Sequence, residues 1–300
     1  MTTVNNIIDW PAEFGPIDAE IECRPVDAKV LAKAMLPESA AILAVTNTGV
    51  WLRSEAIRQG THAYCPAEAF PEFECSTAGA VAVYPSSVST LQFATLSADA
   101  EQISVSLHGE QLTMEANGFG GTVPTVLPQR DAGRHQNIAN LDLREIHDQH
   151  AAEAHVTDWQ FEDFLDSKAY APDSELTLTP DKLSVTTPGS NAQWRWNESA
   201  GSGEATYRGR EFREVFNQLY TIESTPRFTW GNNETVAMIF RGDGWLAIGY
   251  VIPFRNSPSD NSDTVERRCP TCGSQLERES STGNLVCLDP TCGFRSIKLE

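Results

Sequence analysis

The chain has 300 residues, of which 41 are acidic and 22 are basic, and its formal net charge at pH 7 is −19. Hydrophobic residues make up 40% and aromatic residues 9% of the chain, which is enough for a folded core and excludes an intrinsically disordered protein. The acidic residues are spread along the whole length rather than gathered in one patch. This favours a halophilic protein, with a surface adapted to high salt, over a site for one cationic partner.

No segment reads as a targeting signal or a membrane span. The N-terminal stretch MTTVNNIIDWPAEF lacks the basic region followed by an apolar one that a secretory signal has. The longest apolar stretch, WLAIGYVIPF, has half the length of about 20 residues that a membrane helix needs. We therefore expect a cytoplasmic protein without a membrane partner, of cellular or viral origin.

The first half of the chain predicts two successive units, each with one strand, one amphipathic helix and three further strands. In residues 19–70 these elements are AEIECRP, the helix VDAKVLAKAML, the hairpin AAILAVTNTGVWLRSEA and the segment HAYCPAEAF. In residues 79–127 they are GAVAVYP, the helix SSVSTLQFATLSAD, the hairpin ISVSLHGEQLTME and the strand FGGTVPTVL. The apolar residues of this second hairpin alternate with polar ones, as in two antiparallel strands that bury one face: Val105, Leu107, Leu112 and Met114.

The second half of the chain repeats the same order. Residues 153–197 predict a strand at EAHV, the helix TDWQFEDFLDSKAY, the hairpin SELTLTPDKLSVT and the segment NAQWRWN. Residues 204–254 predict the strand EATYRG, the helix REFREVFNQLYTIES and the strands RFTW, TVAMIFRGD and GWLAIGYVIPF. The hairpin of the third unit places its apolar residues at the same spacing as the hairpin of the second unit: Leu176, Leu178, Leu183 and Val185.

Four copies of one βαβββ unit, spaced by about sixty residues, predict a fold that is assembled from repeats. We expect an α+β protein with largely antiparallel sheets, in which paired units pack their helices on one side. The predicted boundaries are a first domain at 1–127, a connector at 128–146 and a second domain at 147–256. The linker at 257–267 is rich in Ser, Asp and Asn, and we predict that it is flexible.

The last segment, residues 268–300, predicts a small zinc ribbon. Two residues separate Cys269 from Cys272, and four residues separate Cys287 from Cys292. A glycine follows the second cysteine of each pair, where the turn of a metal knuckle needs a small residue. Four thiolates at this spacing suit tetrahedral Zn²⁺ without an open position, so we expect Zn²⁺ as a structural rather than a catalytic cofactor.

Three stretches of the chain resemble sliding clamps of the proliferating-cell-nuclear-antigen (PCNA) type from archaea and eukaryotes. They are VDAKVLAKAML with its hairpin and PAEAFPEFE, then QISVSLHGEQLTMEANGFGGTVPTV, and then REFREVFNQLY with RFTWGNNETVAMIFRGDGWLAIGYVIPFRN. The resemblance covers about residues 17–256, and the zinc ribbon is an addition to it. It implies two tandem clamp-like domains in a homotrimeric ring around duplex DNA. A clamp loader, DNA polymerase and other replication or repair proteins are the implied partners.

The same resemblance implies which side chains face DNA and which bind client proteins. In these clamps the helices line the hole, so the candidates for DNA binding are the cations on or beside three predicted helices: Lys29, Lys33, Lys168, Arg208, Arg210 and Arg213. Client peptides dock between the connector and the C-terminal segment, which makes these the candidate partner-binding residues: Val126, Leu127, Ile138, Ile252, Pro253 and Phe254. The alternative for both sets is structural, with solvated helix faces for the cations and ordinary core or strand-end positions for the apolar residues.

We expect a protein without catalytic activity. The three histidines of HDQHAAEAH match no hydrolytic motif, and we interpret the cysteines outside the ribbon as small core residues: Cys23, Cys65 and Cys75. The sequence therefore favours a processivity factor that encircles DNA. The alternative is a clamp-fold zinc-ribbon adaptor in replication, repair or transcription that does not encircle DNA. A third class is a nuclease or another enzyme with an unrecognised site.

Overall fold

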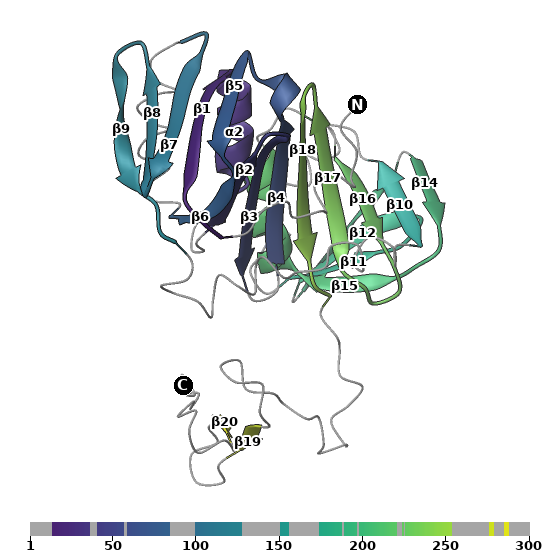
Figure 1. Ribbon diagram of the computed structural model, residues 1–300. Coiled ribbons are helices and arrows are strands. Elements are labelled where there is room, and N and C mark those ends of the chain that lie inside the picture. Colours follow the sequence, from purple (N-terminus) through teal and green to yellow (C-terminus); the bar gives the residue numbers. More distant parts are fainter. Residues whose placement is uncertain are drawn as a thin grey trace. The chain divides into compact units, whose positions relative to one another are not determined.

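The chain divides into two compact units, residues 1–255 and residues 256–300. The computed structural model describes residues 14–36, 41–56, 59–84, 100–127, 151–155, 174–187, 189–196, 198–220, 224, 226–253, 276–278 and 285–287. In the first unit these residues form mainly antiparallel strands, with two α-helices (Figure 1). Within these ranges no helix is long and apolar enough to cross a membrane.

The first half of the larger unit runs from β1 to β9. Its elements are β1 (Ile17–Cys23), α2 (Pro25–Lys33), β2 (Ala41–Thr46), β3 (Gly49–Ala56), β4 (Gln59–Pro66), the 3₁₀ helix η1 (Ala67–Ala69), β5 (Glu72–Thr77), β6 (Gly79–Val83), β7 (Ile103–Gly109), β8 (Gln111–Ala116) and β9 (Phe119–Pro124). Five of these strands form a sheet in the order β5-β1-β7-β8-β9, and the other four lie in the order β6-β2-β3-β4.

The second half repeats this arrangement strand by strand. Its elements are β10 (Ala152–His155), β11 (Glu175–Leu178), β12 (Lys182–Thr187), β13 (Ser190–Arg195), β14 (Glu198–Gly201), β15 (Ala205–Arg208), α7 (Gly209–Tyr220), β16 (Arg227–Trp230), β17 (Val236–Gly242) and β18 (Trp245–Val251). The orders β14-β10-β16-β17-β18 and β15-β11-β12-β13 match the two orders of the first half. In this correspondence β13 is the counterpart of β4, and β18 is the counterpart of β9.

One pair of strands joins the two halves into a nine-stranded sheet. β4 pairs antiparallel with β18, from Tyr64 opposite Leu246 to Gln59 opposite Val251. Every residue of both strands is buried. We call this pair the joint. It produces the sheet order β14-β10-β16-β17-β18-β4-β3-β2-β6, in which β18 and β4 lie side by side (Figure 1).

Both described helices of the larger unit pack on one face of this sheet. α7 buries four apolar residues at helical spacing: Phe212, Val215, Phe216 and Leu219. The helix lies close to β18 at Gly249, where a Cβ atom would be 2.3 Å from Cγ1 of Val215. The side-chain amide of Gln218 donates a hydrogen bond of 2.9 Å to the carbonyl oxygen of Met35, just after α2. The helices of the two halves therefore meet.

The repeated hairpins are confirmed. In β7–β8 and in β11–β12 alike, the predicted apolar residues lie opposite each other in two cross-strand pairs. Seven of these eight residues are buried, and Val105 is half-buried. The predicted helices at 86–99 and 157–170 lie outside the described residues. The sequence pattern did not predict β5 or β14, because neither strand buries a residue: β5 is exposed or half-exposed throughout, and β14 is exposed at each of its four residues.

The sequence predicts that the cysteines outside the ribbon are small core residues. This is confirmed for Cys23 and Cys65 and only in part for Cys75. Cys23 and Cys65 are 2% and 0% exposed. Burial, with a smaller contribution from the negative charges of Asp27 and Glu22, raises the pKa of Cys23 to about 12. Burial also raises the pKa of Cys65 well above its usual value, so both thiols stay protonated and unreactive. Cys75 is half-exposed, because β5 lies at the edge of its sheet.

Candidate nucleic-acid interface and free sheet edges

The two cations of α2 lie on the side of the helix that faces away from the sheet. Lys29 and Lys33 are one helical turn apart and half-exposed, whereas Val30 and Ala32 are buried. Lys33 lies in the last turn of α2, where a positive charge also stabilises the helix dipole. The side chains that the sequence predicts for DNA binding are thus accessible on α2.

The arginines of the second half also face away from the sheet. Arg208 ends β15, Arg210 and Arg213 lie in the first turns of α7, and all three are exposed. Because α2 and α7 meet on one face of the sheet, the cations of the two halves occupy the same helical side of the unit. For these two helices the predicted convergence on one side is confirmed, and the other two predicted helices lie outside the described residues. The remaining predicted cation, Lys168, lies outside the described residues.

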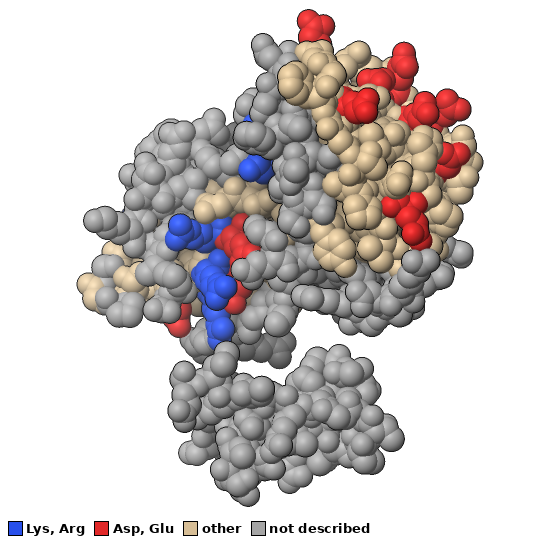
Figure 2. All heavy atoms as spheres, turned by 90° about the vertical axis from the view of Figure 1, so that its left-hand side faces the viewer, with Lys and Arg blue, Asp and Glu red and all other residues tan. Residues whose placement is uncertain are grey.

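Acidic side chains gather on a different surface, the outward side of β1 and β5. Glu20 lies directly opposite Glu74, and Glu22 lies opposite Glu72, while the inward residues of β1 are apolar and buried. In Figure 2 the Lys and Arg side chains gather in one region, and most of the acidic side chains in that view are spread over another. Among the described residues of that view, the cations therefore lie apart from most of the acidic side chains, which makes the helical side the better suited to an anionic partner.

Two of the edge strands among the described residues of the larger unit, β9 and β13, are the counterparts of the strands that form the joint. β9 ends the five-stranded sheet, and β13 ends the four-stranded sheet. Their residues are exposed or half-exposed wherever burial is described, in contrast to the fully buried strands of the joint. An edge strand offers a row of backbone donors and acceptors, which makes it a template for pairing with another chain.

The turn before β9 determines which backbone groups point to this open edge. Asn117 and Gly118 have φ angles of 49° and 78°, as a two-residue hairpin turn requires. The residues that flank such a turn form a hydrogen-bonded pair, and hydrogen-bonded and non-hydrogen-bonded pairs then alternate along the ladder. Thr122 falls in a non-hydrogen-bonded pair with Thr113, so its N–H and C=O groups point away from β8.

Two predicted partner-binding residues, Val126 and Leu127, follow shortly after β9 in the chain, and their side chains pack on different sides of the nine-stranded sheet. Val126 exchanges backbone hydrogen bonds of 2.8 and 3.0 Å with Ala82 of β6. Its side chain packs on the face of the nine-stranded sheet opposite α2 and α7, which we call the outer face. Leu127 packs against the core on the helical side instead. Of these two neighbours, Val126 is the one that borders the outer face.

The predicted residues at the end of the last strand lie elsewhere on the sheet. Ile252 is 41% exposed and Pro253 is buried, directly after β18. Strands β4, β3 and β2 separate β18 from β6, so Val126 and Ile252 lie on different strands rather than side by side. Two members of the predicted set lie outside the described residues: Ile138 and Phe254.

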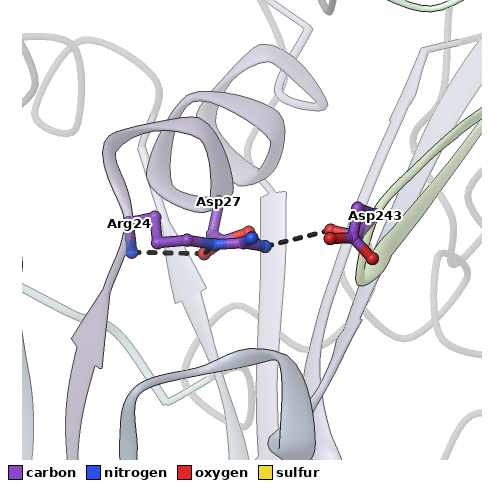
Figure 3. A network of polar contacts seen from close by, with 3 residues as sticks. All are labelled: Arg24, Asp27 and Asp243. Carbon is purple, nitrogen blue, oxygen red and sulfur yellow. Dashed lines mark hydrogen bonds and ion pairs between the residues drawn. The ribbon is translucent and has the colours of Figure 1, made fainter.

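A polar network beside the joint was not predicted from the sequence. The guanidinium of Arg24 donates to both carboxylate oxygens of Asp27, at 2.9 Å from Nε and 2.8 Å from Nη2, and Nη2 donates at 3.0 Å to the carbonyl oxygen of Asp243 (Figure 3). Asp27 is fully buried. The hydrogen bond to Asp27 raises the pKa of Arg24. Arg24 and Asp27 stand three residues apart at the start of a helix, as in a capping box. This spacing could have indicated the contact between Arg24 and Asp27, but not the contact with Asp243.

The network borders a polar cavity of about 510 Å³ between the two halves. Its charged lining consists of Arg24, Glu68, Arg241 and Asp243. Among the described residues, no group of three or more His, Cys, Asp or Glu side chains is placed to hold a metal ion.

The smaller unit contributes one described element, a two-stranded ribbon. β19 (Leu276–Arg278) pairs antiparallel with β20 (Leu285–Cys287), and Leu276 lies opposite Cys287. Cys287 is thus the last residue of β20, and the other three predicted zinc ligands lie outside the described residues. Strands of three residues cannot form a core by themselves.

No protein-family model matches the chain, and no curated protein sequence matches it. Solved structures do match its fold. PCNA of A. fulgidus, bound to the C-terminal region of FEN-1, matches with a TM-score of 0.62 and 10% sequence identity over 80% of this chain and 99% of that one. PCNA of Entamoeba histolytica matches with a TM-score of 0.61 and 11% identity over 79% of this chain and 99% of that one. PCNA of Thermococcus kodakaraensis matches with a TM-score of 0.59 and 12% identity over 79% of this chain and 100% of that one. At these identities the likeness establishes the fold alone.

Proposed function

We propose that this chain, which has the fold of PCNA-type sliding clamps, acts as a sliding clamp. In this proposal three copies close into a ring around duplex DNA and tether DNA polymerase and other replication or repair proteins to it. A ring holds DNA by topology, so it needs only weak contacts to phosphates and no catalytic group. A clamp loader would place the ring on DNA.

The observation that carries the proposal is the joint between β4 and β18. Their counterparts in the opposite halves are β13 and β9, and among the described strands both are edges with one neighbour each. If β9 of one chain pairs with β13 of the next chain as β18 pairs with β4, every chain repeats the contact that already joins its own halves. A head-to-tail contact of this kind closes into a ring when the rotation between copies allows it.

The internal repeat also predicts the register of the contact between chains. In the joint, Ile248 of β18 lies opposite His62 of β4. Each of these is the fourth residue of its strand, and the fourth residues of the counterpart strands are Thr122 in β9 and Gln193 in β13. Both are exposed in the single chain. We therefore place Thr122 of one chain opposite Gln193 of the next.

Cysteine cross-linking tests this register. Opposite residues in an antiparallel pair have Cα atoms about 4.5–5.5 Å apart, within the range of a disulfide. A chain with Thr122→Cys and Gln193→Cys should therefore form covalent dimers and trimers on mild oxidation. The matched control combines Thr122→Cys with Arg195→Cys, which is out of register by two residues, and the unsubstituted chain measures the background of its seven native cysteines. Equal cross-linking by both pairs, or by neither, contradicts the register.

The helical side is the surface that we assign to DNA. Lys29, Lys33, Arg210 and Arg213 are accessible there, and the acidic pairs of β1 and β5 lie on another surface. The whole chain carries a formal charge of −19, which would repel DNA in dilute salt. In about 1 M salt the screening length falls to about 3 Å, so distant acidic groups matter little while topology still retains the DNA.

Client proteins would bind at the outer face. The matching A. fulgidus PCNA structure holds the C-terminal region of FEN-1. In this chain Val126 borders the outer face, and Ile252 is exposed at the end of β18. We propose these two residues, with Ile138, Pro253 and Phe254, as the anchors for client peptides, and we leave out Leu127 because it packs on the helical side.

We propose one structural Zn²⁺ for the smaller unit. The ligands would be the four cysteines with paired spacing: Cys269, Cys272, Cys287 and Cys292. The short β19–β20 ribbon, with Cys287 at its end, supports this assignment, because a hairpin of this size needs a metal or a disulfide to be stable.

A further inference from the structure

Phe119, the first residue of β9, is the most exposed large hydrophobic residue that the structure describes. It is 62% exposed, whereas Tyr84 and Ile252 are 40% and 41% exposed. β9 lies at the end of the five-stranded sheet (Figure 1). A single exposed aromatic ring is common on a protein surface, so its place in the internal repeat determines what it indicates.

The counterpart of Phe119 in the second half of the unit is Trp245. Phe119 lies opposite Ala116 across the two-residue turn between β8 and β9, and Trp245 lies opposite Gly242 across the turn between β17 and β18. Trp245 is 4% exposed, and it lines the polar cavity between the two halves together with Arg24 of the first half. The aromatic residue at the start of β18 is thus buried where the other half adjoins its strand.

One difference between the two hairpins explains why Phe119 does not fold back onto its own strands. The ring of Trp245 lies over Gly242, where a Cβ atom would be 2.1 Å from Cε2 of the ring. The corresponding residue of the first half is Ala116, which has such a Cβ atom. The ring of Phe119 therefore cannot take the place that the ring of Trp245 takes, and it remains exposed at the edge of the sheet.

Trp196, directly after β13, presents a fixed aromatic ring at the other edge strand that has a counterpart in the joint. Its Nε1 donates a hydrogen bond of 2.7 Å to the carbonyl oxygen of Thr179. Its ring centroid lies 5.8 Å from that of Phe228 and 5.9 Å from that of Trp230, both of which are fully buried. Trp196 itself is half-buried. Since this ring is already held in place, a contact with it costs little conformational entropy.

The register of the contact between chains places Phe119 of one chain opposite Trp196 of the next. If Thr122 lies opposite Gln193, each step back along β9 corresponds to one step forward along β13, because the two strands are antiparallel. The three steps from Thr122 to Phe119 therefore lead from Gln193 to Trp196. Residues that lie opposite each other in such a pair also share one face of the sheet.

The faces of the two strands agree with this pairing. Phe119 and Val123 point to the same face of β9, since they are four residues apart in a strand, and Val123 packs against the core. Trp194 and Trp196 also pack against the core. A register shifted by two residues in one direction places Trp194 rather than Trp196 opposite Phe119, so an aromatic partner is present in that register as well.

We infer that Phe119 is the aromatic anchor of the contact between chains and that its ring packs on Trp196 of the next chain. The inference rests on the proposed clamp function, and it adds a side-chain contact to the backbone pairing of β9 with β13. Two aromatic rings in contact gain free energy beyond the area that they bury. Because the anchor lies on β9 and its partner ring follows β13, the contact favours head-to-tail order over the pairing of two like strands.

Site-specific photo-cross-linking of the full chain tests the position of this contact. With p-benzoylphenylalanine in place of Phe119, near-ultraviolet light should yield covalent dimers and trimers. Mass spectrometry should locate the cross-link in the β13 segment that contains Trp194 and Trp196. The same probe in place of Tyr84, another exposed aromatic residue, should not reach this segment. Covalent oligomers whose cross-links from position 119 lie elsewhere would overturn the inference and leave the ring itself intact.

Sedimentation equilibrium of the full chain measures how much the anchor contributes. Phe119→Ala should raise the dissociation constant of each contact between chains roughly tenfold, because the burial of one aromatic ring is lost. Phe119→Trp keeps an aromatic ring and should associate as the unsubstituted chain does, and Tyr84→Ala is the matched control. If Phe119→Ala associates as tightly as the unsubstituted chain, the anchor is wrong and the clamp proposal stands. An unsubstituted chain that stays monomeric at every concentration contradicts both.

Discussion

The guanidinium of Arg24 donates a hydrogen bond of 3.0 Å to the carbonyl oxygen of Asp243, which lies 219 residues later in the other half of the unit. The same guanidinium holds the carboxylate of Asp27, which is fully buried in the first turn of α2. One side chain thus ties the start of a helix in the first half to the β17–β18 turn of the second half. The charge on Asp27 is tolerated in a buried place because Arg24 neutralises it.

Arg24→Gln should lower the free energy of unfolding of the larger unit by about 2 kcal/mol, because Asp27 then remains as a buried carboxylate without its cationic partner. This value lies below the usual range for fully buried pairs, since the Arg24 side chain is 36% exposed. Denaturant titration measures the change. Arg241→Gln is the matched control, because Arg241 lines the same cavity. If the two variants unfold with the same free energy, the network does not stabilise the joint.

Replacement of Arg210 and Arg213 by alanine should weaken DNA binding equally for every sequence. Each phosphate contact that is lost should reduce the slope of log affinity against log salt by about 0.9. The matched control is the double variant Lys182→Ala and Arg241→Ala, which removes the same charge from β12 and β17. Fluorescence anisotropy at several salt concentrations distinguishes the two. Equal slopes for both double variants mean that α7 does not face the DNA.

Stability should fall when the pH drops below the ordinary pKa of histidine. His62 is completely buried opposite Arg53, and burial, followed by the charge of Arg53, lowers the pKa of His62 well below 6.5. Below pH 6.5 the unfolded chain therefore binds a proton that the folded chain does not, and acid favours unfolding by up to about 1.4 kcal/mol per pH unit. His62→Gln should remove the contribution of His62 to the pH dependence of the free energy of unfolding.

The measurement for His62 is the free energy of unfolding between about pH 7.5 and about pH 5.5. His108→Gln is the control, because His108 is 54% exposed and pairs with Asp18 at the surface. Identical pH slopes in the unsubstituted chain and in His62→Gln would mean that folding does not lower the pKa of His62.

Cys269→Ser should remove zinc from the purified chain and leave the larger unit intact. Loss of one thiolate opens a four-ligand structural site and weakens metal binding strongly, and the two units are separate compact bodies. Elemental analysis measures the zinc content, and thermal unfolding follows the larger unit. Cys75→Ser, a half-exposed cysteine of β5, should keep the full zinc content. Zinc that persists at full stoichiometry in Cys269→Ser contradicts the assignment.

The repeated hairpins and α7 were predictable because one face of each element is buried and the other is not. Leu176 and Leu178 alternate with polar residues at a period of two, so the sequence indicates both the strand and its inward face. Phe212, Val215 and Phe216 recur at the helical period of α7, which indicates its buried side in the same way. These patterns are local, and they do not depend on the partner element.

The joint and the polar network could not be predicted in this way. Every residue of β4 and of β18 is buried, so neither strand shows an alternation that identifies its neighbour. The contact of Arg24 with Asp243 depends on the joint, and local sequence indicates only its capping partner Asp27. β14 was missed for the opposite reason, because all four of its residues are exposed and no apolar pattern marks it.

If β9 and β13 repeat the joint between neighbouring chains, the full chain in solution at high salt has the mass of three copies. We predict a particle of three times 32.9 kDa by light scattering. Thr122→Pro should give monomers, because it removes the N–H group that points to the open edge of β9, while Thr122→Val keeps that group and should remain trimeric. A mass of 32.9 kDa for the unsubstituted chain at every concentration, or trimers that survive Thr122→Pro, would rule out pairing of β9 with β13 between chains.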